Sequence, residues 1–203
     1  MTLALIDYGA GNLRSVENAL KAAGAPDVSV TADPEAVRAA DRIVLPGVGA
    51  FGACMGALSA LDGMIEALNE RVVKQGTPFL GICVGMQLMA DAGEEMGIFP
   101  GLGWIEGTVR QLPDVPGLKV PHMGWNDVVP SQEHPLIVPG EAYFLHSYAF
   151  DVADQSELIA ATDHGGPVTA ALGRDNMLGV QFHPEKSQAY GLALLGRFLE
   201  WKP

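Results

Sequence analysis

One short segment constrains the fold of this chain more than any other, the run Phe79-Leu-Gly-Ile-Cys83-Val-Gly-Met-Gln87. Its apolar start predicts a buried strand over residues 79–82, and residues 84–90 have a helical pattern. The Gly-x-Cys-x-Gly turn between them predicts a strained backbone at Cys83, with glycines where neighbouring chain segments come close. The segment therefore predicts a strand, a sharp turn and a helix, with one thiol presented at the turn.

The first half of the chain alternates short apolar runs with helical patterns. We expect strands over residues 2–6, 28–31, 43–45 and 79–82, and helices over residues 13–23, 65–74 and 84–90. Asn12 is a residue type that commonly caps a helix, so it predicts the start of the first one. Strands that alternate with helices indicate βαβ units and a mostly parallel sheet.

From Trp104 onward the pattern changes to short β-rich segments separated by Pro, Gly and Asp. We expect strands and hairpins within residues 107–112, 127–129, 142–151 and 168–172, the end of a strand over 180–182, and a closing helix over 189–201. No repeat, low-complexity tract or linker divides the chain. We therefore predict one domain over residues 1–203 with an α/β fold. It would have a mostly parallel central sheet flanked by helices, with additional antiparallel strands in the second half.

The composition excludes several classes of function. The chain has 203 residues, of which 48% are hydrophobic and 18% are charged, as is typical of a globular protein. Its formal net charge of −12 argues against sequence-independent nucleic-acid binding, which requires Lys and Arg to neutralise phosphates. No apolar run reaches the roughly 18 residues of a membrane helix, and no basic segment follows Met1. We therefore expect a soluble cytoplasmic protein that binds neither nucleic acid nor membrane.

The two cysteines, Cys54 and Cys83, are too few for a disulfide framework in a chain of this length. Cys83 precedes a predicted helix, whose N-terminus favours the nucleophilic thiolate, and the N–H of Val84 is placed to donate to an oxyanion. The alternative is an ordinary buried thiol, because free cysteine is among the most buried residue types. Cys54 lacks this context, so we predict that it contributes only to packing.

A second segment, Gly179-Val-Gln-Phe-His183-Pro-Glu185, supplies a candidate base. Pro184 disfavours helical backbone at His183, and residues two apart in an extended chain project to the same side. The Glu185 carboxylate can therefore accept from one nitrogen of His183 and leave the other for Cys83. A solvated turn would explain the tripeptide alone, but its pairing with the cysteine turn favours the catalytic interpretation.

Glycine-rich loops and the remaining histidines carry weaker signals. The loop Pro46–Gly49 follows a predicted strand and can present N–H groups to an anion, although a plain turn has the same signature. A dinucleotide fingerprint that starts at Gly9 is incomplete, because Arg14 occupies the place of its third glycine. We predict solvated positions for His134 and His164 and, without any metal-ligand spacing, no metal and no cofactor.

The cysteine turn followed far downstream by His-x-Glu resembles the class I, or triad, glutamine amidotransferases. Further segments, which together span nearly the whole chain, narrow the resemblance to one branch. This branch contains the glutaminase subunits of imidazole glycerol phosphate synthase, an enzyme of histidine biosynthesis. The segments are residues 7–16, 46–51, 81–88, 121–126, 143–148 and 182–187. The sequence keeps all three residues of the family's triad.

The resemblance implies a mechanism. Cys83 would attack the side-chain amide of glutamine and form a glutamyl thioester. His183 would first accept the thiol proton and then protonate the departing ammonia, while Glu185 orients it. Backbone N–H groups would hold the oxyanion, at Val84, Val48 and Gly49. We expect low basal activity, because the glycine-rich oxyanion loop would need contact with a partner to reorient.

Glutamine and a partner protein are the ligands that the resemblance implies. The substrate contacts would be Gln87, Glu95, His146 and Ser147, with Glu94 as the alternative to its neighbour. A separate (β/α)8-barrel synthase subunit would form a heterodimer with this chain. It would use the ammonia to make imidazole glycerol phosphate and an aminoimidazole carboxamide ribotide. The interface would include His122, Trp125, Asn126 and Lys186; without the resemblance, core packing explains Trp125 better.

Three other functions compete with this one. Another branch of the superfamily, such as the glutaminase of pyridoxal phosphate synthase or anthranilate synthase, keeps the triad and changes the acceptor. Residues 7–16 and 121–126 argue against it. A non-catalytic binding module is disfavoured by the intact triad. A free-standing cysteine peptidase or hydrolase predicts activity on peptides or other amides without a partner.

Overall fold

A central sheet of nine strands organises the structure, a computed structural model that describes all residues from 1 to 203. The first part of this sheet is parallel, in the order β2-β1-β3-β4-β13. Its strands are β1 (Leu3–Ile6), β2 (Val28–Thr31), β3 (Arg42–Gly47), β4 (Phe79–Cys83) and β13 (Met177–Val180). All except β2 are buried along their whole length, as expected for parallel strands covered by helices on both faces.

Antiparallel strands extend the same sheet beyond β13, in the order β12-β11-β8-β9. They are β8 (His122–Pro130), β9 (Gly140–His146), β11 (Leu158–Asp163) and β12 (Pro167–Arg174). A second sheet of four short strands has the order β10-β7-β5-β6. Its strands are β5 (Ala92–Gly93), β6 (Phe99–Pro100), β7 (Gly107–Gln111) and β10 (Tyr148–Val152).

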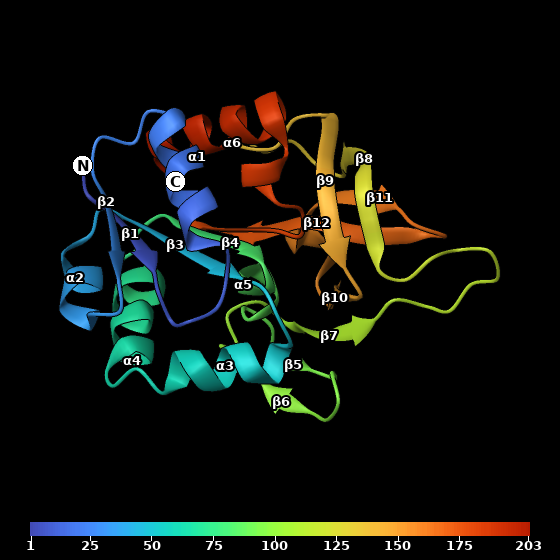
Figure 1. Cartoon of the computed structure of the whole chain (residues 1–203), viewed down its shortest axis with the longest axis horizontal. Helices are drawn as coiled ribbons and strands as arrows, with labels where there is room; N and C mark the ends of the chain where they lie inside the picture. Colours follow the sequence, from blue (N-terminus) through green and yellow to red (C-terminus); the bar gives the residue numbers. More distant parts are fainter.

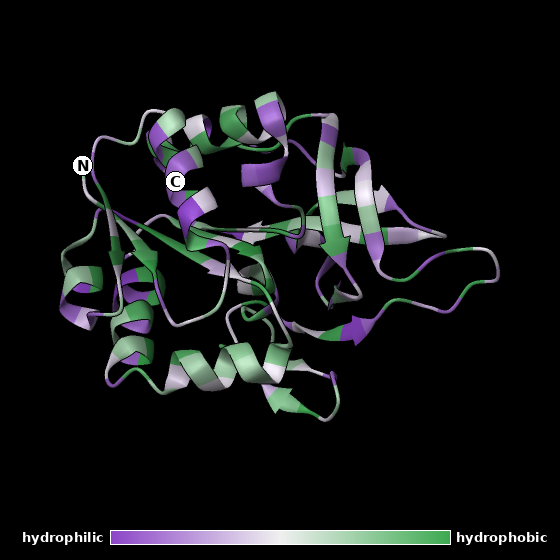
Figure 2. Ribbon diagram, in the orientation of Figure 1, coloured by the Kyte–Doolittle hydropathy of each residue, from purple (hydrophilic) through white to green (hydrophobic).

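Two groups of helices cover opposite faces of the parallel strands (Figure 1). One group contains α1 (Leu13–Ala22) and α6 (Gln188–Glu200). The other contains α2 (Pro34–Ala39), α3 (Phe51–Ser59), α4 (Met64–Leu68) and the π-helical segment η1 (Asn69–Lys74). Figure 2 shows that the enclosed strands are largely hydrophobic, whereas the helices mix hydrophobic and hydrophilic residues. This contrast places the main core between the sheet and its helices.

Three shorter helical segments complete the chain: α5 (Val84–Gln87), η2 (Gln155–Glu157) and η3 (Pro184–Lys186). α5 follows β4 directly and η3 follows β13 after a short extended link, so both leave the carboxyl ends of neighbouring parallel strands. No single helix is both long and apolar enough to cross a membrane. Only α3 and α4–η1 taken together, which are bent by 94°, reach that length and composition.

The structure confirms the α/β class, with antiparallel strands added in the second half. The β-rich segment over residues 142–151 contains two strands, because the chain bends at Ser147 and its two parts join different sheets as β9 and β10. The helix predicted over residues 84–90 is only one turn long, and the second part of the helix at 65–74 is π-helical. Asn12 stands at the N-cap of α1, but its side chain makes no capping hydrogen bond.

Candidate active site

Cys83 lies at the junction of β4 and α5 with φ 54° and ψ −113°, so the predicted backbone strain is present. The flanking glycines are required by space. A Cβ atom on Gly85 would lie 1.9 Å from the carbonyl oxygen of Leu45, and one on Gly81 would lie 2.7 Å from the Gly85 carbonyl. The turn can form only because these two positions have no side chain.

His183 is held in place by three neighbours. Its backbone N–H donates to the carbonyl of Tyr143 (2.9 Å), and its own carbonyl accepts from the hydroxyl of Ser187 (2.7 Å). Its ring Nδ1 lies 2.8 Å from Oε1 of Glu185, with both side chains almost fully buried. The backbone at His183 is extended, as Pro184 predicts. Nε2 is therefore left free to serve Cys83.

The electrostatics of the pair favour a protonated imidazole. Burial lowers the pKa of His183, but its interactions with Cys83 and Glu185 outweigh that effect and raise the pKa to about 9. The second carboxylate oxygen of Glu185 is buried and has no hydrogen-bond partner. Because this buried charge has only His183 to compensate it, the two groups are strongly coupled.

The Cys83 side chain opens into a cavity of about 260 Å³. This volume lies just below the range typical of drug-sized ligands, which suits an occupant the size of an amino acid. The cavity brings together every residue predicted for the oxyanion and for the substrate, and both Cys83 and His183. Its lining includes Val48, Gly49, Val84, Gln87, Glu95, His146, Ser147 and Lys186.

The two adjacent glutamates have different surroundings. Glu95 lines the cavity, and its Oε2 accepts from the backbone N–H of Phe51 (2.7 Å). Glu94 is absent from the cavity lining and instead lies 3.5 Å from the guanidinium of Arg110. Of the two alternatives, only Glu95 can therefore meet a molecule bound at Cys83.

Cys54 packs beneath the loop that was predicted to hold an oxyanion. It is buried, and its Sγ lies 3.8 Å from the carbonyl oxygen of Val48. Tyr8 supports the same loop, because its hydroxyl donates to the carbonyl of Pro46 (2.7 Å). Burial raises the pKa of Tyr8, and the neighbouring Cys54 raises it further. This tyrosine was not predicted from the sequence, since nothing local relates it to the loop.

Gln181 is a second residue that the sequence analysis missed. Its Nε2 lies 3.7 Å from Sγ of Cys83, and its Oε1 accepts from Nε2 of Gln87 (3.0 Å). The side chain is completely buried. The available signal was its place two residues before His183, which puts both side chains on one side of an extended segment.

The residues predicted for a protein interface fall into two groups. Trp125 is 47% exposed, so core packing does not explain it, and it contacts Tyr143 edge to face at 6.1 Å. The ammonium of Lys186 lies over the other side of this small cluster, 5.8 Å from the Tyr143 ring centre. The His122 side chain is only 4% exposed in the isolated chain, and its place at an interface stays a prediction.

The prediction of solvated histidines also needs correction. His164 is half-buried and stacks on His122 with ring centres 4.1 Å apart, because β8 and the end of β11 bring the two rings together. His134 is half-buried as well, packs edge to face against Trp201, and has its pKa lowered by burial. No group of three or more His, Cys, Asp or Glu is arranged to hold a metal ion.

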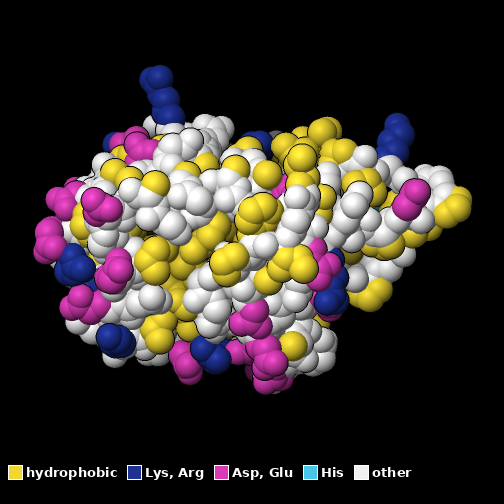
Figure 3. Space-filling model, turned by 90° about the horizontal axis from the view of Figure 1, so that it is seen from below, with side chains coloured by type: hydrophobic (Ala, Val, Ile, Leu, Met, Phe, Trp, Pro, Cys, Tyr) yellow, Lys and Arg dark blue, Asp and Glu magenta, His cyan; other side chains and the backbone are white.

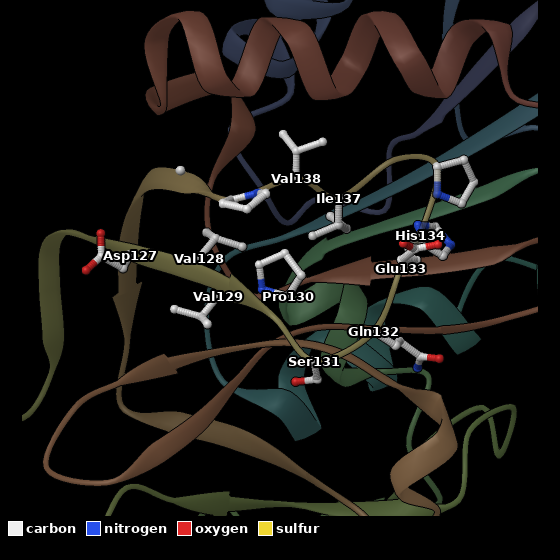
Figure 4. A pocket seen from close by; sticks show the side chains of 13 residues that line it. Asp127, Val128, Val129, Pro130, Ser131, Gln132, Glu133, His134, Ile137 and Val138 are labelled. Atoms are coloured by element: carbon white, nitrogen blue, oxygen red, sulfur yellow. The ribbon is translucent and has the colours of Figure 1, made fainter.

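A larger cavity, of about 1080 Å³, lies away from Cys83 (Figure 4). One continuous segment, residues 127–140, forms all of its lining. Its ionisable groups are Asp127, Glu133 and His134, and it contains no nucleophile paired with a base. The smaller cavity therefore remains the candidate active site.

The charge of −12 is not spread evenly over the surface. Figure 3 shows one face on which Asp and Glu side chains, with some Lys and Arg among them, gather at one end and along the lower edge. Hydrophobic and uncharged side chains lie between them. This face therefore has charged margins and a centre with little charge.

Comparison with known proteins agrees with this geometry. The family model described as glutamine amidotransferase class-I matches residues 4–200. Three similar proteins, from Zymomonas mobilis, Rhodospirillum rubrum and Caulobacter vibrioides, are named imidazole glycerol phosphate synthase subunit HisH. They are 63%, 53% and 52% identical to this chain, in that order, and each match extends over the whole of this chain. The same matches extend over 97%, 100% and 99% of the lengths of those proteins.

Solved structures show the same fold at low sequence identity. A crystal structure of a glutamine amidotransferase matches with a TM-score of 0.76 and 19% identity, over 97% of both chains. The structure of PurLQS from Thermotoga maritima matches with a TM-score of 0.71 and 18% identity, over 98% of this chain and 97% of that one. At these identities the matches establish the architecture alone.

Proposed function

The chain belongs to the class I glutamine amidotransferases, in the branch of HisH subunits of imidazole glycerol phosphate synthase, and on this premise we propose that Cys83, His183 and Glu185 hydrolyse glutamine. The observation that carries the proposal is the local geometry. A strained cysteine and a buried imidazole border one small cavity, and a carboxylate at 2.8 Å fixes the far nitrogen of that imidazole. Nucleophile, base and orienting group are thus present together.

In the first half of the reaction, the Cys83 sulfur attacks the amide carbon of glutamine. The proton resides on Nε2 of His183, whose pKa of about 9 keeps the imidazole protonated at neutral pH. The developing oxyanion accepts a hydrogen bond from the N–H of Val84, the first residue of α5. Since α5 is only one turn long, the helix dipole adds less than a long helix would.

In the second half, the C–N bond breaks as His183 gives its proton to the departing nitrogen, which leaves as ammonia. Cys83 is now joined to the glutamyl group as a thioester. His183, neutral again, accepts a proton from a water molecule that attacks the thioester carbonyl. Glutamate is released, and the proton returns the pair to its starting state. Glu185 keeps the ring in one orientation through both halves.

Glutamine itself is recognised by two acceptor groups. Both N–H bonds of the Gln87 amide are already used, in hydrogen bonds to Gln181 and to the carbonyl of Tyr148 (3.0 Å each). Its Oε1 accepts no hydrogen bond within the chain, so it remains available to a donor. The Oε1 atom of Gln87 and the carboxylate of Glu95 together suit the α-ammonium group of the substrate. The backbone at His146 and Ser147 closes the cavity above it.

The loop at Val48 explains why basal activity is expected to be low. Its carbonyl is held at 3.8 Å by Cys54, a weak sulfur donor, and Gly49 has φ +128°. A peptide held this weakly beside a glycine can rotate at little cost. Contact with a partner would then turn an N–H group of this loop towards the oxyanion.

The ammonia passes to a separate (β/α)8-barrel synthase subunit in a cytoplasmic heterodimer. That subunit makes imidazole glycerol phosphate and an aminoimidazole carboxamide ribotide. The cluster of Trp125, Tyr143 and Lys186 supports this arrangement, because the exposed Trp125 offers an aromatic anchor and Lys186 borders the cavity. Aromatic residues of this kind dominate the energy of many interfaces.

The decisive test measures glutamine hydrolysis by the purified chain, with and without the barrel subunit and its nucleotide ligand, beside a Cys83→Ala control. Strong stimulation by the partner that Cys83→Ala abolishes would support the whole proposal. Hydrolysis that depends on Cys83 but ignores the partner would point to a free-standing hydrolase or another branch. No hydrolysis from folded chain with a competent partner would favour a non-catalytic module.

A further inference from the structure

A chain of hydrogen bonds runs inward from β8, the strand that carries Trp125. It begins at Asn126, whose Nδ2 donates to the carbonyl of Asp163 (2.8 Å) and lies 3.0 Å from Nε2 of His122. Nδ1 of His122 in turn lies 2.9 Å from Nε2 of His146, on the neighbouring strand β9. The outer part of this series of hydrogen bonds therefore joins β8 to a residue that lines the cavity.

The inner part of this series of hydrogen bonds ends at Sγ of Cys83. Nδ1 of His146 is 2.8 Å from the carbonyl oxygen of Tyr148, and the same oxygen accepts from Nε2 of Gln87 at 3.0 Å. Gln87 also donates to Gln181, whose amide nitrogen lies 3.7 Å from Sγ of Cys83. The path from β8 to Sγ of Cys83 therefore consists of side chains and one backbone carbonyl, that of Tyr148.

Only one assignment of donors and acceptors satisfies every hydrogen bond in this series. The Tyr148 carbonyl can only accept, so Nδ1 of His146 must carry its proton, and Nε2 of the neutral ring must accept. His122 therefore donates from Nδ1 and accepts at Nε2, which matches the N–H that Asn126 presents. Both rings must be neutral. Burial lowers the pKa of His146 to about 3 and that of His122 to about 4, which agrees.

His122 is enclosed and cannot meet a partner directly. Its ring stacks between Phe144, with centres 4.7 Å apart, and His164 at 4.1 Å. His164 is itself tied by Nε2 to the carbonyl of Lys119 (2.9 Å). Asn126 has no free N–H, and its Oδ1 accepts from the backbone of Asp127 (2.9 Å). Both residues use their polar groups inside the chain.

We propose that His122 and Asn126 are positioning residues for glutamine binding, which act through His146 on the Tyr148 carbonyl and the Gln87 amide. The inference rests on the proposed glutaminase function. Asn126 sets the tautomer of His122, and His122 sets that of His146. His146 then holds the carbonyl that accepts one Gln87 N–H group, while Gln181 accepts the other, and this fixes the Gln87 amide with its Oε1 open to the substrate. The two residues are therefore not contacts for the partner subunit.

The experiment measures the Kd of glutamine by calorimetry on complexes with the barrel subunit, in a Cys83→Ala background that prevents turnover. Asn126→Leu keeps approximately the size of the side chain, removes both N–H donors and adds no charge, so Nε2 of His122 loses the donor that fixes its tautomer. His122→Leu removes the link, whereas His122→Asn keeps a donor near the position of Nδ1. Gln132→Leu is the matched control. It also replaces an amide that donates to two backbone carbonyls, but it lies outside the cavity.

We expect Asn126→Leu and His122→Leu to raise the Kd of glutamine at least about ten-fold, the effect of one broken buried hydrogen bond. His122→Asn and Gln132→Leu should stay within about three-fold of the parent, and the affinity for the barrel subunit should not change in any variant. Unchanged glutamine binding by Asn126→Leu, or an equal loss in Gln132→Leu, overturns the inference.

Weaker partner binding with normal glutamine binding shows instead that these residues contact the partner. If His122→Leu does not fold, Asn126→Leu, at a less buried position, still decides. Hydrolysis by the wild-type complex is measured separately, so a failure of the glutaminase proposal is distinguished from a failure of this one.

Discussion

Replacing Glu185 with glutamine removes the buried carboxylate that faces the imidazole of His183. The pKa of His183 rises from its ordinary 6.5 to about 9 even though burial acts to lower it. Each pKa unit corresponds to about 1.4 kcal/mol, so the protonated ring is favoured by about 3 kcal/mol in total. Cys83 and Glu185 share this effect, and the carboxylate contributes through both its charge and its hydrogen bond at 2.8 Å.

For Glu185→Gln we expect kcat for glutamine to fall by about 10² or more in the complex with the barrel subunit. The pKa of His183, followed by NMR, should fall, because Cys83 alone is then left to oppose the effect of burial. Glu94→Gln is a suitable control, since it also removes one carboxylate but lies outside the cavity and pairs with Arg110. A kcat within three-fold of wild type, or a His183 pKa that stays near 9, would refute the reasoning.

Three other predictions concern stability and assembly. Gly85→Ala should lose about 3 kcal/mol of unfolding free energy or fail to fold, because its Cβ would lie 1.9 Å from the Leu45 carbonyl oxygen. Gly56→Ala is the control and should be neutral or stabilising, because the space around its Cβ is open. Urea denaturation measures the free energy of unfolding of both variants. The folded state keeps His122 and His146 neutral down to about pH 4 and 3, whereas the unfolded chain protonates them near pH 6.5. Their contribution to stability is therefore present above pH 6.5 and declines as the pH falls towards 4, and thermal unfolding scans should show less of this decline in His122→Asn. Trp125→Ala should weaken binding of the barrel subunit at least about ten-fold, because an exposed aromatic residue can anchor an interface. It should change the Tm by less than about 2 °C, because the side chain is 47% exposed. An unchanged Kd for the barrel subunit would place the interface elsewhere.

The strands and the contact between His183 and Glu185 could be predicted because their signals are local. The parallel strands are apolar runs bounded by turn residues, and four of the five are buried along their length. His183 and Glu185 are two residues apart in extended chain, so their contact follows from backbone geometry alone. α2 also had a local signal that went unused: Asp33 precedes Pro34, and its carboxylate caps the N–H of Glu35.

Other features had no local signal. α3 was not predicted, because its sequence is apolar on most sides and small residues interrupt any stripe at helical spacing. The break at Ser147 is hidden in a continuous β-rich run, since either half could pair with any sheet edge. Local alternation determines that a segment is a strand, but not which neighbour completes its hydrogen bonds.

The sequence by itself therefore determined the alternation of strands and helices, the strained cysteine turn and the pairing of His183 with Glu185. Only the tertiary structure decided that Glu95 and not Glu94 borders the cavity, that Gln181 reaches Cys83, and that His122 is enclosed. The physical reason is the range of the interactions. Backbone geometry and periodicity act over a few residues, whereas these contacts join side chains that meet only after distant strands have paired.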